Sequence, residues 1–197
     1  MFRLPTIFAI ALLLLTACGT SEVLEPIDGT VPSGIDLSGN WLMRDPNVAD
    51  QQRVNDAIRK TDGMKDDDFS VKPNSNRSRQ SKSRKNKGGL VHVFLETGTA
   101  LKVTQTAHGV FVSFDRSVVE EYRFGESRII SVGQVEAQRV TGWKDDRLVI
   151  ETLDKNSMKL TENYRVIDGG QTLERTIIFR SRDLQEETII QEFDRTD

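Results

Sequence analysis

The sequence predicts an all-β fold, an antiparallel up-and-down meander closed into a barrel of about 8–10 strands, with one helix and a disordered basic loop inserted after the first strand. From Leu90 to the end, runs rich in Val, Ile, Thr, Phe and Tyr alternate with turn residues at fairly regular intervals. The connections are short, which favours antiparallel neighbours. No ten-residue helical pattern interrupts these runs, which argues against a βαβ architecture.

The N-terminus has the pattern of an export signal. One cationic residue, Arg3, precedes an apolar run over residues 7–15. This run is shorter than the roughly 20 residues that a membrane-spanning helix needs. We therefore expect residues 1–17 to be a signal peptide.

The apolar run ends in Leu15-Thr16-Ala17-Cys18, which contains the only cysteine. This tetrad resembles the lipobox of bacterial lipoproteins. The resemblance implies that Cys18 receives a diacylglycerol, loses the preceding residues and is acylated on its new amino group, so that several acyl chains anchor the protein to a membrane. In Gram-negative bacteria, an aspartate directly after the lipidated cysteine resembles a signal for retention in the inner membrane. Here Gly19 stands at that position, so we expect the protein in the outer membrane, facing the periplasm. An ordinary secretory signal with an incidental cysteine is the alternative.

The composition of the exported part indicates its domain organisation and its possible partners. The 197 residues carry 27 Lys and Arg against 30 Asp and Glu, and the formal net charge is -3. This slight acidity and the expected compartment argue against nucleic acid as a partner. Residues 18–36, rich in Pro and Gly without a hydrophobic period, predict a flexible tether. Residues 37–197 are long enough to form one β-barrel domain without disulfides.

The first strand is predicted from Leu37 to Met43. Its Gly39-Asn40-Trp41 triplet resembles the G-x-W of the first strand in lipocalins. The resemblance implies a tryptophan that plugs the closed end of a barrel and a long loop after the first strand. In lipocalins a late-chain arginine packs over this tryptophan, and the sequence does not identify one. A tryptophan at the start of a strand in any β core is the alternative.

The insertion over residues 45–89 has two halves. Asp45 as N-cap and Pro46 at N1 predict a helix to about Lys60 that lies on the barrel, because its apolar stripe is narrow. The second half is rich in Ser, Asn and charge, which predicts disorder. Its basic residues form either a solvated loop or a contact with an anionic surface or partner. These residues are Lys72, Arg77, Arg79, Lys82, Arg84, Lys85 and Lys87.

Ten further strands are predicted after the insertion, at 90–95, 101–106, 110–115, 118–124, 128–132, 135–142, 147–153, 158–167, 172–180 and 184–193. The segments 141–152, 162–164 and 168–173 are similar to segments of uncharacterised bacterial lipocalin-like secreted proteins. The similarity implies a β-meander and brings no activity with it. We expect Trp143 to pack against the end or rim of the barrel.

Side-chain parity places polar residues on the inward face of three strands. Glu162 shares a face with Tyr164, and the short turn that follows sets Tyr164 opposite Arg175, with Glu162 diagonally within reach. Glu120 shares a face with Tyr122 in the same way. Inward charges must be paired or meet the polar head of a ligand, because a lone buried charge costs several kcal/mol. These five residues form a candidate ligand pocket. A structural ion pair, or a bulge that turns them to solvent, is the alternative.

The sequence shows no catalytic motif. His92, expected in a strand, and His108, expected in a turn, lack metal-ligand spacing, and no G-x-S-x-G elbow or P-loop is present. We therefore expect neither an enzyme, a metal site nor a cofactor. Two function classes are left: an envelope lipoprotein that binds a small amphipathic molecule in its barrel, and a structural or interaction protein that uses the basic run of residues 72–87. The sequence carries no signal for the oligomeric state.

Overall fold

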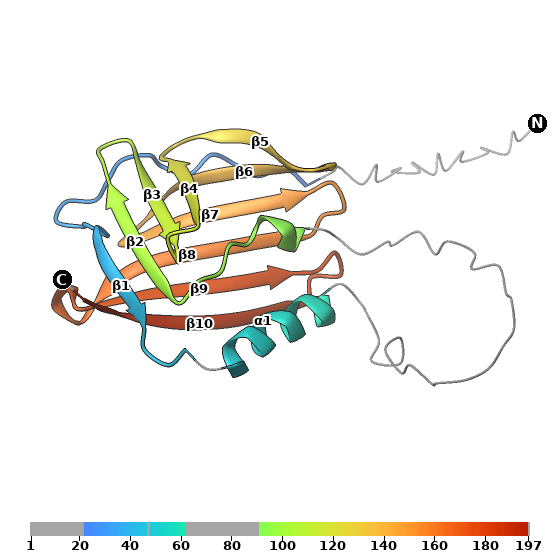
Figure 1. Cartoon of the computed structure of the whole chain (residues 1–197). Helices are drawn as coiled ribbons and strands as arrows, with labels where there is room; N and C mark the ends of the chain where they lie inside the picture. Colours follow the sequence, from blue (N-terminus) through green and yellow to red (C-terminus); the bar gives the residue numbers. More distant parts are fainter. Residues whose placement is uncertain (1–21, 47, 62–90, 197) are drawn as a thin grey trace, which may run out of the picture.

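The computed structural model describes residues 22–46, 48–61 and 91–196 (Figure 1). Ten strands in this part of the chain form one antiparallel sheet in the order β4-β3-β2-β1-β10-β9-β8-β7-β6-β5. The strands are β1 (Gly39–Met43), β2 (Ala100–Gln105), β3 (Gly109–Phe114), β4 (Val118–Arg123), β5 (Ser127–Val132), β6 (Val135–Lys144), β7 (Arg147–Asp154), β8 (Lys159–Ile167), β9 (Thr172–Arg180) and β10 (Glu186–Arg195). The helical segments are α1 (Val48–Thr61), η2 (Val91–Phe94) and η3 (Asp168–Gly170).

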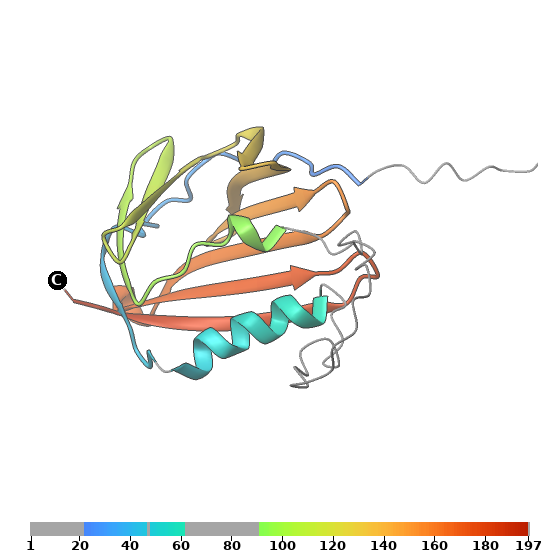
Figure 2. The same cartoon turned by 45° about the vertical axis from the view of Figure 1, so that its right-hand side comes forward.

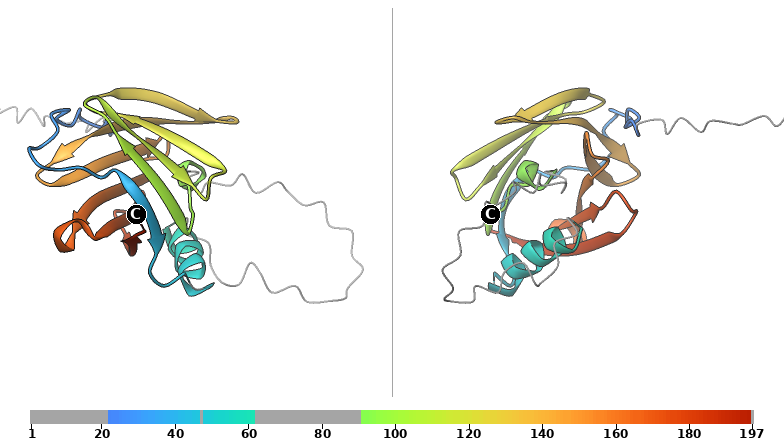
Figure 3. Two further views of the ribbon diagram at one scale, coloured as in Figure 1. Left: turned by 60° about the vertical axis from the view of Figure 1, so that its left-hand side comes forward. Right: turned by 90° about the vertical axis from the view of Figure 1, so that its right-hand side faces the viewer.

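The sheet curls into a half-barrel around a buried apolar interior, so the predicted all-β meander is confirmed (Figure 3). Its two edges are β4 and β5, which follow one another in the chain but share no ladder. They separate because the chain crosses towards β6 at Gly125, whose N–H donates to the Thr141 carbonyl at 2.8 Å. Nη2 of Arg128 bridges the gap by donating to the Glu121 carbonyl at 3.2 Å.

The predicted strand over residues 90–95 is wrong. Residues 91–94 form the 3-10 turn η2, in which Val91 and Phe94 are buried. Two buried side chains three positions apart match a helical turn of three residues, and a strand would bury every second one. His92 therefore lies half-buried on this turn and not in a strand.

Helix α1 runs alongside β10 and packs on the halves of β9 and β10 next to their hairpin (Figure 2); we call this end of the half-barrel the capped end. The helix begins at Val48, three residues after the predicted N-cap, and runs to Thr61. Val54 and Ala57 are buried and pack, together with η2, on inward-facing side chains of β8, β9 and β10. The narrow apolar stripe thus covers an end of the barrel. No helix in the described part of the chain is long and apolar enough to cross a membrane.

Residues 22–28 pack on the outer face of β6 and β7, and Val31 and Ile35 pack against the apolar cluster around Trp41, so the predicted flexible tether is wrong for this part of 18–36. Leu24 and Ile27 are buried in a small apolar cluster with side chains of β6 and β7. The N–H of Leu24 donates to Oε1 of Gln138 at 2.8 Å, and the N–H of Trp143 donates to the Asp28 carbonyl at 2.7 Å. Pro and Gly content indicated flexibility, but the two buried side chains fix the segment. Residues 18–21, with Cys18, and the basic run lie outside the described residues.

The close approach of this segment depends on Gly142, where a Cβ would lie 2.4 Å from the Asp28 carbonyl oxygen. We expect Gly142→Ala to push the segment off β6 and to lower the free energy of unfolding by about 1–3 kcal/mol. Hydrogen exchange should accelerate at the Trp143 amide, which loses its acceptor, while amides in β8 and β9 change little. Unchanged exchange at Trp143 would show that the segment accommodates the methyl group.

A candidate ligand site in the barrel interior

The interior of the half-barrel has a polar layer between two apolar clusters. Along β9, Leu173 belongs to the cluster around Trp41, Ile177 to the cluster under α1, and Arg175 lies between them. Strands β8 and β10 repeat this order, since each has an inward polar residue between two apolar ones. The inward polar side chains of the layer are Glu120, Arg139, Thr152, Glu162, Arg175 and Gln191.

Arg175 and Glu162 form an ion pair at the centre of this layer, with exposed fractions of 0% and 1%. The predicted register is confirmed, because Tyr164 lies opposite Arg175. Nε of Arg175 donates to Oε2 of Glu162 at 3.2 Å, and the Tyr164 hydroxyl donates to the same oxygen at 3.0 Å. Nη1 of Arg175 reaches Oε1 of Gln191 at 3.5 Å. The ring of Phe114 flanks the guanidinium at 5.1 Å.

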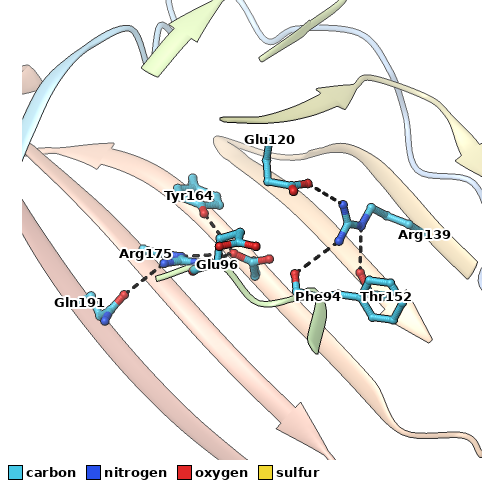
Figure 4. A network of polar contacts seen from close by, with 9 residues as sticks. Phe94, Glu96, Glu120, Arg139, Thr152, Tyr164, Arg175 and Gln191 are labelled. Carbon is cyan, nitrogen blue, oxygen red and sulfur yellow. Dashed lines mark hydrogen bonds and ion pairs between the residues drawn. The ribbon is translucent and has the colours of Figure 1, made fainter. Parts of the chain in front are cut away.

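A second buried arginine, Arg139, completes the layer and was not predicted (Figure 4). Its Nη1 donates to Oε2 of Glu120 at 3.2 Å and its Nε to Oγ1 of Thr152 at 3.1 Å. The guanidinium stacks on the ring of Tyr122 at 5.4 Å. Arg139 therefore joins the predicted pair of Glu120 and Tyr122. The available signal was parity, since Arg139 lies four residues before Trp143, on the same face of one strand.

Residues 91–99, which we call the inner strap, cross the interior next to this layer (Figure 2). Nη2 of Arg175 donates to the Glu96 carbonyl at 2.7 Å. Nη2 of Arg139 contacts the Phe94 carbonyl at 3.5 Å. Both guanidinium groups are thus held by the backbone of the chain itself, as Figure 4 shows. The inner strap fills part of the space that a ligand would occupy.

Two buried atoms have no hydrogen-bond partner among the described residues: Oε1 of Glu162 in the layer, and the hydroxyl of Tyr122, whose ring packs on Arg139 of the layer. Burial, and then the charge of Glu162, raise the pKa of Tyr122 well above its usual value, so its hydroxyl is neutral and able to donate. A buried polar group without a partner costs about 1–3 kcal/mol. The layer therefore offers one unused donor and one unused acceptor.

The formal charges of the layer cancel, since Arg139 and Arg175 face Glu120 and Glu162. The arrangement has neither a nucleophile beside a base nor a paired acid and base, and is suited to holding a polar group. Among the described residues, no three His, Cys, Asp or Glu side chains lie close enough together to hold a metal ion.

The far end of the interior from α1 is closed by Trp41, whose ring lies under the guanidinium of Arg195 at 4.1 Å. Arg195 also donates through Nε to the Gly170 carbonyl at 2.6 Å and through Nη1 to the Ser38 carbonyl at 2.9 Å. It is the late-chain arginine that the sequence did not identify. The predicted last strand stopped at Phe193, whereas β10 continues to Arg195, directly opposite Trp41.

The fold is a ten-stranded antiparallel sheet curled into a half-barrel, with a polar layer inside its apolar interior. No family model and no curated protein matches the sequence. Among solved structures, the chain is similar to secretory abundant heat soluble protein 4 from Ramazzottius varieornatus, with 15% identity, a TM-score of 0.48, and 81% of this chain and 94% of that chain covered.

Two further structures resemble the barrel. One is zebrafish ileal bile acid-binding protein complexed with cholic acid, with 10% identity, a TM-score of 0.43, and 81% of this chain and 98% of that chain covered. The other is a mutant of the REP1-NXSQ fatty acid transporter, with 11% identity, a TM-score of 0.43, and 82% and 98% covered. These likenesses concern the shape of the barrel.

Proposed function

We propose that this protein binds a small amphipathic molecule in its barrel and that the polar layer holds the polar group of that molecule. The observation that supports this function is the pair of unpartnered buried atoms, the Tyr122 hydroxyl and Oε1 of Glu162. Most buried polar atoms in native proteins have a partner, and a ligand group that accepts from one and donates to the other supplies it. In this proposal the protein acts as a carrier.

The charge balance of the layer selects the chemistry of the ligand. Because two arginines and two glutamates already cancel, another buried charge would be unpaired and cost several kcal/mol. A neutral group that both donates and accepts, such as an alcohol or an amide, fits without this cost. The apolar cluster under α1 then contacts the hydrocarbon part of the ligand.

Ligand entry requires a movement of the inner strap, because it lies beside the layer and bonds to both arginines. A cleft of about 480 Å³ between α1 and β10 borders the apolar cluster under α1, since its lining includes Ala57 and Ile189. A small displacement of α1 and the inner strap therefore opens a path to the polar layer.

Tyr122→Phe should weaken binding of a fluorescent fatty alcohol by about fivefold to tenfold, because the ligand loses one buried hydrogen bond. The free protein should be as stable as before or more so, since the lost hydroxyl has no partner. Tyr164→Phe is the matched control: its hydroxyl already donates to Glu162, so this change should reduce stability more than affinity.

Mass spectrometry of an organic extract from protein purified out of a periplasm provides the direct test. A stoichiometric neutral amphiphile is the expected result. An empty extract, together with equal affinities for Tyr122→Phe and the unchanged chain, would overturn the carrier function.

The second candidate is a structural or interaction protein of the cell envelope. It is favoured by the inner strap, which bonds to both arginines from within the chain and occupies part of the barrel interior. The basic run of residues 72–87 would then contact an anionic surface or partner. Binding to anionic vesicles that weakens as salt rises, with an empty extract, would favour this candidate.

We further propose that acyl chains on Cys18 anchor the protein to the outer membrane, facing the periplasm. The lipobox-like tetrad supports the anchor, and Gly19 after the cysteine supports the outer membrane. Cys18→Ser should release the protein into the soluble periplasmic fraction, and mass spectrometry of the N-terminal peptide should show the acyl groups only on the unchanged chain.

A further inference from the structure

Three hairpins, the end of α1 and the first described residue all lie at the capped end of the barrel (Figure 1). The hairpins are those between β5 and β6, β7 and β8, and β9 and β10. Nζ of Lys60, near the end of α1, contacts Glu187 at 3.2 Å. Glu22, where the described chain begins, forms an ion pair with Arg180 at the end of β9. The chain towards Cys18 therefore leaves the barrel at this end.

The link from the barrel to Cys18 is short. Four residue steps separate Cys18 from Glu22, and an extended chain spans at most about 3.6 Å per residue, so the two lie within about 14 Å. Glu22 cannot drift away from the barrel, because its partner Arg180 and the bonds of Leu24 to Gln138 hold the segment. A bilayer that holds acyl chains on Cys18 must therefore lie close to the capped end.

The capped end also exposes apolar side chains. Val132 lies at the tip of the β5–β6 hairpin, Leu184 at the tip of the β9–β10 hairpin, and Val23 beside Glu22, and all three are exposed. At the β9–β10 tip the charges of Arg182 and Asp183 cancel. The apolar side chains are the feature that water disfavours and the interface of a bilayer accepts.

Leu184 is the most informative of these residues. It is 69% exposed and has a φ of 61°, in the left-handed region, which costs about 1–2 kcal/mol for a residue with a Cβ. The turn itself is held by backbone bonds, from Leu184 N–H to the Ser181 carbonyl at 3.0 Å and from Ser181 N–H to the Gln185 carbonyl at 2.8 Å. The leucine side chain therefore contributes nothing to the turn, which glycine would form with less strain.

We propose that the capped end is a membrane-contact surface, in which Val23, Val132 and Leu184 insert into the interface of the bilayer that holds the acyl chains of Cys18. This inference rests on the proposed anchor at Cys18. It orients the barrel with α1 and the cleft beside it towards the lipid, so an amphipathic ligand passes between bilayer and barrel over a short distance.

The test uses the full acylated chain in vesicles of phosphatidylethanolamine and phosphatidylglycerol that contain brominated lipid. Leu184→Trp should be quenched at least about twofold more than Leu42→Trp, because only position 184 meets the bilayer. Leu42 is the matched control, an exposed leucine of β1 opposite Asp194, away from the capped end. The native Trp41 and Trp143 are buried and give the same background in both variants. Equal quenching at the two positions would overturn the proposal.

Leu184→Gly separates contact from folding. It should leave stability equal or higher, because glycine fits the left-handed position, and weaken binding of the non-acylated Cys18→Ser chain to the same vesicles about fivefold. Unchanged vesicle binding would contradict the surface. Mass spectrometry of the N-terminal peptide tests the anchor independently of the quenching. A peptide without acyl groups refutes the anchor even where Trp at position 184 is quenched. An acylated peptide without quenching refutes the contact surface alone.

Discussion

Replacing Glu162 alone with leucine should lower the free energy of unfolding by about 3–5 kcal/mol at pH 7, as measured by urea denaturation. Arg175 is fully buried and would keep its charge without the carboxylate that receives its Nε–H. The Tyr164 hydroxyl would lose its acceptor at the same time. The Glu96 carbonyl and Gln191 remain as partners of Arg175, but neither carries a negative charge.

The double variant Glu162→Leu/Arg175→Leu separates a lost charge partner from lost packing. Replacing a buried ion pair by apolar residues is often nearly neutral, so most of the stability should return. The affinity for a fatty alcohol should fall, because Glu162 supplies the unused acceptor. A double variant with unchanged folding and unchanged affinity would refute a role of this pair in ligand binding.

The centre of the polar layer was predictable because β8 and β9 alternate clearly between an inward and an outward face. Alternation placed Glu162 and Tyr164 on one face, and the short turn at η3 fixed Tyr164 opposite Arg175. The length of the apolar runs also predicted most strand boundaries to within a few residues. The role of these residues in binding stays a prediction.

Arg139 was missed because β6 is buried on both faces over most of its length. Val140 points outward and lies under the N-terminal segment with Leu24, while Arg139 points inward. Once a segment from elsewhere in the chain covers the outer face, alternation of polar and apolar residues disappears from the sequence. The incorrect prediction of a flexible tether and the missed arginine thus have one cause, the packing of residues 22–28 on the outer face of β6 and β7.

The incorrect prediction of a strand over residues 90–95 has a different cause, the shortness of this apolar run. The run Val91-His92-Val93-Phe94-Leu95 has a composition typical of a strand, and a run of this length does not distinguish a strand from a helical turn. Within this run Phe94 accepts from Arg139, and the residue after the run, Glu96, accepts from Arg175, so the contacts of the inner strap join residues far apart in the sequence. The local sequence pattern therefore could not predict the structure of the inner strap.

Trp41→Ala should lower the free energy of unfolding by about 3–5 kcal/mol, because it removes a fully buried indole from the largest apolar cluster. The indole Nε1–H also donates to the Leu37 carbonyl at 3.1 Å, and this bond ties the start of β1 to the end of the barrel. Urea denaturation measures the loss. Leu42→Ala is the control on the same strand, with an expected loss below about 1 kcal/mol, since Leu42 is half-exposed.

Arg195→Ala tests whether Trp41 and Arg195 act together. The variant loses the contact with the ring and two bonds to backbone carbonyls, of Gly170 and Ser38, so it should destabilise by about 1–3 kcal/mol. In a double-mutant cycle, the two changes should couple by about 1 kcal/mol, because the guanidinium stacks on the indole. Additive losses would mean that Arg195 stabilises β10 through its carbonyl bonds alone. Trp41 and Arg195 close the end of the barrel opposite α1. If their replacement lowers stability in a coupled way but leaves the affinity for the fatty alcohol unchanged, the ligand does not enter at this end, and the capped end remains the route of entry.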